Sequence, residues 1–187
     1  AERLRDYASA LDYAGRAYGL APTSETTREA LEESGRRARN AEAVVALYSD
    51  RLDALGEGDE DERLWLRRRI ASISGEELGQ TEQAVAQLQR ILEVEPKDAE
   101  AADALEVIYR NAGQSPELRG LLIHRIEHAD SDAERGERLR ALALLEEDVL
   151  EDPESAALRH MEILEIDPDD GDSLAALDRL TAATEDW

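Results

Sequence analysis

The segment with the clearest catalytic spacing is His124-Arg125-Ile126-Glu127-His128, which reads H-x-x-E-H. In zinc peptidases with this pattern, two histidines one helical turn apart bind the metal and a nearby Glu activates water. Such a site also needs a third protein ligand held in a cavity. The same segment has the apolar periodicity of a packed helix, at Leu118, Leu121, Leu122 and Ile126. We therefore keep a zinc metallopeptidase only as a remote alternative, and predict neither catalytic residues nor a metal site.

Other chemical motifs are weaker. The segment Asp167-Pro168-Asp169-Asp170-Gly171 is similar to a calcium loop, but its Gly stands fifth instead of sixth, and a turn followed by a helix cap explains it. The acidic run from Asp59 to Glu62 could attract a divalent ion loosely, although such runs are usually only solvated. Cysteine is absent, which excludes disulfides, thiolate metal sites and Cys nucleophiles in this chain. We predict no cofactor.

The elements that would position these residues are helices. The 187 residues are 42% hydrophobic, mostly Leu and Ala, with 4% aromatic residues and no Phe, a composition that favours helices over strands. The apolar periodicity predicts ten helices and no strand. The first five span roughly 3–20, 24–38, 41–55, 61–74 and 81–94, and the others begin near Asp98, Ser115, Ser131, Asp152 and Asp170.

Local signals mark where these helices begin and end. Ser24 and Asp98 should cap the second and sixth helices with their side-chain oxygens. Gly113 should end the sixth helix, and Ser131 to Glu134 reads as a capping box. The stretch from Gly75 to Gln80 should break the chain between the fourth and fifth helices.

The helices recur with a long period. Pro22, Pro96 and Pro168 each close an apolar segment at nearly equal intervals, and each is followed by an Ala-Leu pair at a constant offset. A period of this kind is typical of a stacked helical array. We therefore expect residues 1–187 to form one array without an internal boundary.

The chain resembles the tetratricopeptide repeat family over nearly its whole length. In the sixth and seventh helices, Leu105, Tyr109, Gly113 and Leu118 fall where that family places its Leu, its Tyr, its turn Gly and the residue that opens the second helix. Three other helices have the spacing of the family's second-helix Ala, aromatic, Ala and terminal Pro: Ala10-Ala14-Ala17-Pro22, Ala84-Leu88-Ile91-Pro96 and Ala156-His160-Ile163-Pro168.

The departures from the family point to a divergent, bacterial-type branch. Glu32 and Glu106 stand where the family prefers Gly or Ala, and Arg125 stands where a small residue is usual. Alternate pairs have longer loops, which lead into the same triplet, Glu62-Arg63-Leu64 and Glu137-Arg138-Leu139. The phase of the copies predicts a start on the second helix of one pair and an end on the first helix of another, hence a fragment of a longer array.

The resemblance implies an all-α solenoid, a right-handed superhelix of antiparallel helix pairs, whose first helices line a concave groove for peptides or partner proteins. The register of the fourth and eighth helices stays open. Groove positions carried over residue by residue are Thr26, Glu29, Glu33, Arg36 and Arg37; Glu100, Asp103, Val107, Arg110 and Asn111; and Asp172, Ala175, Arg179, Ala182 and Ala183.

The net charge of the chain limits the classes of molecule that it can bind. A formal net charge of -23 repels phosphate backbones and anionic membranes, so we expect no nucleic acid and no membrane partner. Lys97 is the only lysine, so a carboxylate clamp built from paired Lys and Asn is not expected either. We predict a protein-interaction scaffold for a basic and apolar segment, while the same charges could instead only solvate the groove or pair within it.

Two further questions stay open at this point. The alternative function is a structural module that self-associates through its open ends, where Trp187 and the unpaired tenth helix would expose apolar surface. The compartment is not determined. A cytoplasmic protein is favoured, but a targeting signal could lie outside the fragment.

The excess negative charge predicts a salt dependence of stability. The melting temperature should rise between about 0.01 M and 0.1 M NaCl, because the Debye length falls from roughly 30 Å to about 10 Å and self-repulsion is screened. Thermal unfolding followed by circular dichroism checks this. A flat or falling curve would mean that the charges are already balanced locally.

Overall fold

The computed structural model describes the backbone of residues 2–185 and the side chains of residues 6–182, and over this range it is all-helical, with no strand. It confirms the predicted all-α class and the ten helices. Their bounds are α1 (Glu2–Leu20), α2 (Glu25–Ala38), α3 (Ala41–Asp53), α4 (Glu60–Ser72), α5 (Thr81–Val94), α6 (Ala99–Ala112), α7 (Ser115–Glu127), α8 (Asp132–Asp148), α9 (Pro153–Ile166) and α10 (Gly171–Glu185), with a π turn η1 (Ile73–Glu77) after α4.

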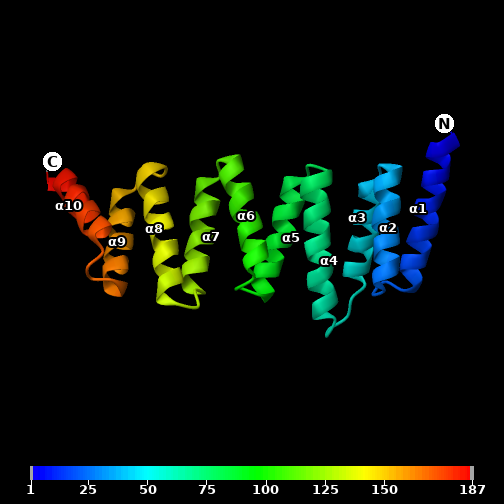
Figure 1. Ribbon diagram of the computed structural model, residues 1–187, viewed down its shortest axis with the longest axis horizontal. Coiled ribbons are helices and arrows are strands. Elements are labelled where there is room, and N and C mark those ends of the chain that lie inside the picture. Colours follow the sequence, from blue (N-terminus) through cyan, green and yellow to red (C-terminus); the bar gives the residue numbers. More distant parts are fainter. Residues whose placement is uncertain (1, 186–187) are drawn as a thin grey trace. The chain divides into compact units, whose positions relative to one another are not determined.

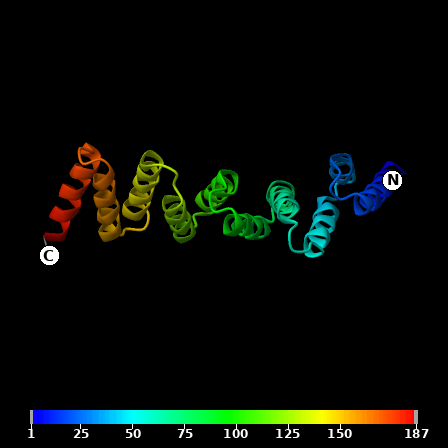
Figure 2. The same ribbon diagram turned by 90° about the horizontal axis from the view of Figure 1, so that it is seen from below.

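The helices gather into two compact units, residues 1–91 and 92–187, which we call unit 1 and unit 2. In unit 1, α1 packs on α2, α2 on α3 and α3 on α4; in unit 2, each of α6 to α9 packs on the helix that follows it. Within each unit, consecutive helices run in alternating directions beside each other (Figures 1 and 2). This is the packing of a helical repeat array, in which each helix buries its apolar stripe against its sequence neighbours.

The core of unit 1 has an aromatic centre. Tyr48 is fully buried beside Leu31, and its ring meets Tyr18 and Trp65 edge-on at centroid distances of 5.3 Å and 5.5 Å. The guanidinium of Arg28 lies 3.6 Å from the centre of the Trp65 ring, a cation–π contact that covers this cluster. Burial raises the pKa of the Tyr18 hydroxyl to about 12.

Unit 2 has an aliphatic core. Leu105 of α6 is buried at the repeat position of Leu31, and the other buried apolar side chains of this unit include Tyr109, Leu118, Leu122, Leu139, Leu142, Ala156 and Ile163. The leucines of the repeated Ala-Leu pairs therefore mark core positions in the first two copies, whereas Ala30 is exposed and Ala104 is half-buried. In α10 the corresponding Leu177 is only half-buried.

Several helix ends form as predicted. The Asp98 carboxylate accepts a hydrogen bond from the backbone N–H of Ala101 at 2.7 Å and caps α6. Gly113 follows α6 with φ 65°, in the left-handed region that favours glycine. Arg39 holds the same place after α2 with φ 52°, so the turn is kept even where no glycine is available.

Two predicted caps differ in detail. The Ser24 hydroxyl makes no cap bond to α2; instead the Thr27 hydroxyl donates to the carbonyl oxygens of Ala21 at 2.5 Å and Ser24 at 2.9 Å. The capping box at α8 is half formed. Ser131 accepts from the N–H of Glu134, but the Glu134 carboxylate accepts from Asp130, one residue before the expected donor.

The predicted break from Gly75 to Gln80 begins later than expected, at Leu78, because the chain stays helical through the π turn as far as Glu77. Gly75 lies against α5, since a Cβ built on it would be 3.4 Å from the Cβ of Ala84, an ordinary van der Waals contact. The left-handed residue that ends the turn is Gly79, with φ 66°.

The structure fixes the register of α4 and α8, which the sequence left open. A left-handed residue follows each helix, Gly79 after α4 and Glu151 after α8. The next residue in each case donates a backbone hydrogen bond to the carbonyl oxygen six residues earlier, from Gln80 to Ser74 and from Asp152 to Glu146. These equivalent sites are separated by the same interval as Pro96 and Pro168. The two Glu-Arg-Leu triplets lie further apart than that, so they do not hold equivalent positions in the repeat.

Among the helices described, none combines the length and apolarity that crossing a bilayer requires.

The burial of the core leucines predicts how much stability is lost when one of them is shortened to alanine. Replacing Leu105 or Leu122 with Ala should lower the free energy of unfolding by about 2 to 5 kcal/mol, because each is at most 1% exposed and a cavity would remain. Urea unfolding measures the change. Leu158→Ala is the control, since that side chain is 50% exposed, and an equal loss in all three variants would contradict the packing.

Candidate protein-interaction surface

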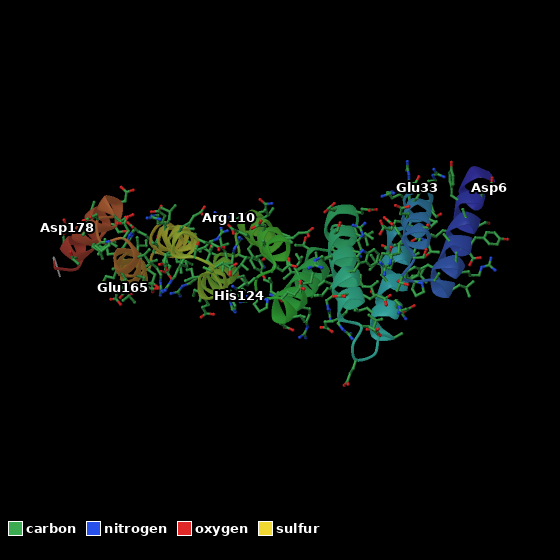
Figure 3. All side chains as sticks on the ribbon, turned by 60° about the horizontal axis from the view of Figure 1, so that its bottom comes forward. Asp6, Glu33, Arg110, His124, Glu165 and Asp178 are labelled. Carbon is green, nitrogen blue, oxygen red and sulfur yellow. The ribbon has the colours of Figure 1, made fainter. Side chains whose placement is uncertain are left out.

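The residues predicted to line a groove lie on three helices, α2, α6 and α10. Their side chains are exposed, except that Glu33 is half-buried and that the side chain of Ala183 lies outside the described residues. The α2 set belongs to unit 1. The other two sets belong to unit 2, where α6, α8 and α10 form one row and α7 and α9 lie on the other side, so that Arg110 and Asp178 are separated from His124 and Glu165 (Figure 3). We call α6, α8 and α10 the first-helix row.

The α2 set is largely paired within its own helix. The Glu33 carboxylate accepts from Arg36 at 2.9 Å and from Arg37 at 2.8 Å. The hydrogen bond from Arg36, with the charge of Arg37, holds the pKa of Glu33 below its usual value. Thr26 and Glu29 are exposed on the same helix.

The α6 set explains two departures from the family pattern. Arg125 of α7, 9% exposed, donates to Asp103 at 2.7 Å and to Glu106 at 2.9 Å. Glu106 also accepts from Arg110 of its own helix. The unexpected Glu and Arg are therefore partners, and the pair replaces close helix approach by a charge-assisted contact. Val107 remains 58% exposed beside them.

The α10 set meets α8. Arg179 pairs with Glu147 of α8, with one contact at 2.9 Å, and Arg140 of α8 pairs at 2.6 Å with Asp170, which precedes α10. The hydrogen bond from Arg140 lowers the pKa of Asp170 to about 2. Leu144 lies between these two pairs, on the same stripe of α8 as Arg140 and Glu147, and is 63% exposed.

The sequence reasoning missed the contacts that α4 makes with α2 in unit 1 and those that α8 makes with the α10 region in unit 2. On α4, Arg69 makes two hydrogen bonds to Glu32 of α2, at 2.9 Å and 2.7 Å, and the Tyr48 hydroxyl donates to the same carboxylate. On α8, the stripe of Arg140, Leu144 and Glu147 at intervals of four and three residues was the available signal.

The two units differ strongly in charge. Residues 1–91 contain 18 acidic and 13 basic residues, whereas residues 92–187 contain 27 acidic and 9 basic residues. Unit 1 therefore has a formal net charge of -5 and unit 2 a net charge of -18. The acidity of the chain is concentrated in the unit that contains the first-helix row.

The H-x-x-E-H segment uses its histidines in backbone hydrogen bonds. Nε2 of His124 lies 2.9 Å from the carbonyl oxygen of Pro96, and Nδ1 of His128 lies 2.8 Å from the carbonyl oxygen of His124. Over the described part of the chain, no three His, Asp or Glu side chains are placed to hold a metal ion together.

The acidic segment before α10 forms the turn and cap that its sequence predicts. Asp167 accepts from the N–H of Asp169, and Asp170 accepts from the N–H of Ser173 at 2.8 Å. Ser173 is buried and its hydroxyl lies 3.1 Å from Nδ1 of His160. Burial lowers the pKa of this half-buried histidine.

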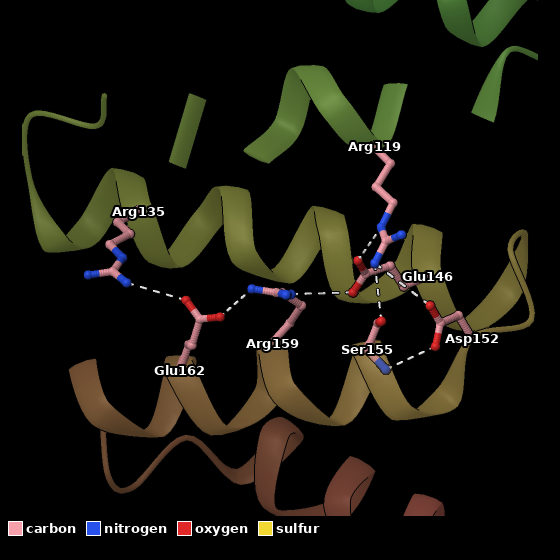
Figure 4. Close-up of polar contacts among 7 residues, drawn as sticks. All are labelled: Arg119, Arg135, Glu146, Asp152, Ser155, Arg159 and Glu162. Atoms are coloured by element: carbon pink, nitrogen blue, oxygen red, sulfur yellow. Dashed lines mark hydrogen bonds and ion pairs between the residues drawn. The ribbon is translucent and has the colours of Figure 1, made fainter. Parts of the chain in front are cut away.

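Glu146 of α8 is a buried carboxylate that contacts both neighbouring helices. Glu146 is fully buried; its Oε1 accepts from Nε of Arg119 on α7 at 2.7 Å, and its Oε2 lies 3.4 Å from Nε of Arg159 on α9 (Figure 4). Arg119 also reaches the Ser155 hydroxyl at 3.1 Å. Glu162 extends the network by pairing with Arg159. One carboxylate thus connects three consecutive helices.

No known protein-family model matches the chain, and no curated protein matches it either. The resemblance to the tetratricopeptide repeat family therefore rests on the residues and spacings given above.

We expect that removing the charge of Glu146 lowers the stability of the fold markedly. Glu146→Gln should lower the free energy of unfolding by about 2 to 4 kcal/mol, since it removes the buried carboxylate between Arg119 and Arg159 and leaves Arg119 with Asp152 at 3.7 Å and Arg159 with Glu162. The loss is kept below that of a fully buried pair because 36% of the Arg119 side chain and 21% of the Arg159 side chain are exposed.

Glu147→Gln is the matched control for chemical denaturation. Its partner Arg179 is 60% exposed, so the loss should stay below about 1 kcal/mol. Similar losses in the two variants would show that Glu146 does not organise the contact between α7, α8 and α9.

Proposed function

We propose that this chain is a protein-interaction scaffold, and that the first-helix row of unit 2 binds a partner segment with both basic and apolar side chains. The observation that carries the proposal is Leu144, an apolar side chain left 63% exposed between two acid–arginine pairs. Isolated exposed leucines are common, but this one lies in a row where α10 presents the small exposed side chains Ala175 and Ala182.

Apolar contact would supply part of the affinity. Burying a leucine side chain fully is worth about 1.5 to 3 kcal/mol, and Leu144 retains more than half of its exposed area. Val107 offers a second exposed apolar side chain on α6. Arg140 and Glu147, on either side of Leu144 along α8, pair with Asp170 and Arg179, so a partner side chain that covers Leu144 would lie close to α10.

Charge would supply attraction and orientation. The net charge of -18 on unit 2 raises the local concentration of cationic segments and speeds their association. The ion pairs on this row do not oppose binding, because exposed pairs such as Arg179 with Glu147 contribute little and can be exchanged for contacts to a basic partner. An acidic ligand or nucleic acid would be repelled.

A peptide titration tests the proposal. We expect a fluorescent peptide of alternating Arg and Leu to bind more tightly than a peptide of alternating Arg and Ser with the same length and charge, as measured by fluorescence anisotropy. Leu144→Ser should weaken the Arg-Leu peptide about tenfold, which corresponds to about 1.4 kcal/mol of lost apolar contact.

The matched control is Leu158→Ser on α9, which removes a leucine of similar exposure from the other side of unit 2 without changing the charge. The affinity of the Leu158→Ser variant for the Arg-Leu peptide should differ from that of the wild type by less than about twofold. Equal binding of the two peptides, or equal losses in the two variants, would reduce the interaction to non-specific charge attraction and contradict the proposed surface.

A further inference from the structure

The repeat places an ionisable side chain at a packed position of α9. Ala14 of α1, Leu88 of α5 and His160 of α9 hold the same position in three successive copies. Ala14 and Leu88 are apolar and at most 8% exposed, so this position belongs to the packed side of the helix. His160 is half-buried, and it is the one residue of the three that can gain a charge near neutral pH.

The His160 ring lies where α9 meets its two neighbours in unit 2, because α9 packs on both α8 and α10. Nδ1 of His160 lies 3.1 Å from the hydroxyl oxygen of Ser173 on α10, a residue that is 1% exposed. The charged groups that act on the ring are Glu147 of α8, Arg179 of α10 and Asp170 in the turn before α10. A charge on this ring would therefore be felt by both neighbouring helices.

Both carboxylates near the ring are already paired with arginines. Glu147 accepts from Arg179 at 2.9 Å, and Asp170 accepts from Arg140 at 2.6 Å. An imidazolium at His160 would compete with these arginines for the carboxylates, and the Arg179 guanidinium would repel it. Because the ring is half-buried, water can solvate the new charge only in part. Burial lowers the pKa of His160 by more than the charge of Glu147 raises it, so this site favours the neutral ring.

We infer that protonation of His160 weakens the contact between α9 and α10, so that this junction of unit 2 loosens in mild acid. The imidazolium can gain solvation by turning toward water, which takes the ring away from the buried Ser173 hydroxyl. It can instead turn toward Glu147, which takes that carboxylate away from Arg179 and breaks the ion pair between α8 and α10. Either movement removes a contact that holds α10.

The pH range follows from the direction of the shift. The pKa of His160 is lower in the folded chain than in the unfolded chain, so the folded chain binds fewer protons between the two values. The stability that the neutral ring contributes is complete above about pH 6.5, the ordinary value for histidine, and is lost as the pH falls through the folded pKa. Glu147 and Asp170 stay ionised in this range, because hydrogen bonds from their arginine partners lower the pKa of each carboxyl group.

The loosened junction alters the first-helix row. That row includes α10, and the pair of Arg179 with Glu147 is one of the two that flank Leu144. The inference does not depend on the proposed peptide binding, since protonation of His160 acts on the packing of α9 and α10 whether or not a ligand is present.

Hydrogen exchange of the α10 amides, followed by NMR at about pH 7.5 and about pH 5.5, tests the inference. After correction for the intrinsic exchange rate at each pH, the amides from Leu174 to Leu180 of the wild type should lose about threefold or more of their protection at the lower pH. His160→Leu places at this position the residue type of the equivalent Leu88, and its protection should change by less than about 1.5-fold.

His160→Gln is a second variant that does not titrate and that can still form a hydrogen bond with Ser173, and it should behave like His160→Leu. His128→Gln is the control. It removes a half-buried histidine of α7 that contacts the carbonyl oxygen of His124, and it should keep the wild-type response of α10.

The titration of the ring gives an independent measurement. The chain has 3 histidines, so the NMR signal that is missing in His160→Leu identifies His160, and this signal should titrate below the ordinary value of about 6.5. The inference is overturned if the wild type keeps its protection in mild acid, if the two His160 variants lose as much protection as the wild type, or if the His160 signal titrates at or above the ordinary value.

Discussion

Within each unit, a helix carries an apolar stripe that it cannot bury alone, and it packs on the helices next to it in sequence. Leu31 of α2, which packs on both α1 and α3, is inaccessible, whereas Leu177 of α10, which packs on α9, is only half-buried. Burial at a given repeat position is therefore set by neighbouring helices. The exposed faces, the core and the first-helix row all follow from this constraint.

The features that the sequence predicted well are local ones. Helix ends at Asp98 and Gly113 depend on one side chain or one backbone angle, so a short stretch of residues is enough to place them. The exposure of the predicted groove positions on α2, α6 and α10 also follows from the phase of the apolar stripe, which the repeated Ala-Leu pairs establish.

The features that the sequence did not reveal depend on which helices meet. The π turn at Ile73–Glu77 and the equivalence of Ser74 with Glu146 arise from the packing of α4 and α8 on the helix that follows, and the similar Glu-Arg-Leu triplets pointed to a different alignment. The pairing of Arg125 with Glu106 crosses two helices, so each residue looked like an isolated departure until their contact was seen.

The Glu146 network also bears on how a repetitive chain avoids assembling in the wrong order. Consecutive repeats expose similar stripes while they fold, and a helix can dock on the wrong copy. At the position of Glu146, the π turn η1 after α4 carries Ser74, whose hydroxyl donates to Gln83 of α5. If α9 docked on α4 instead of α8, the Arg159 guanidinium would face the neutral hydroxyl of Ser74 in place of the Glu146 carboxylate. This mismatch disfavours the docking of a helix on the wrong copy of the repeat.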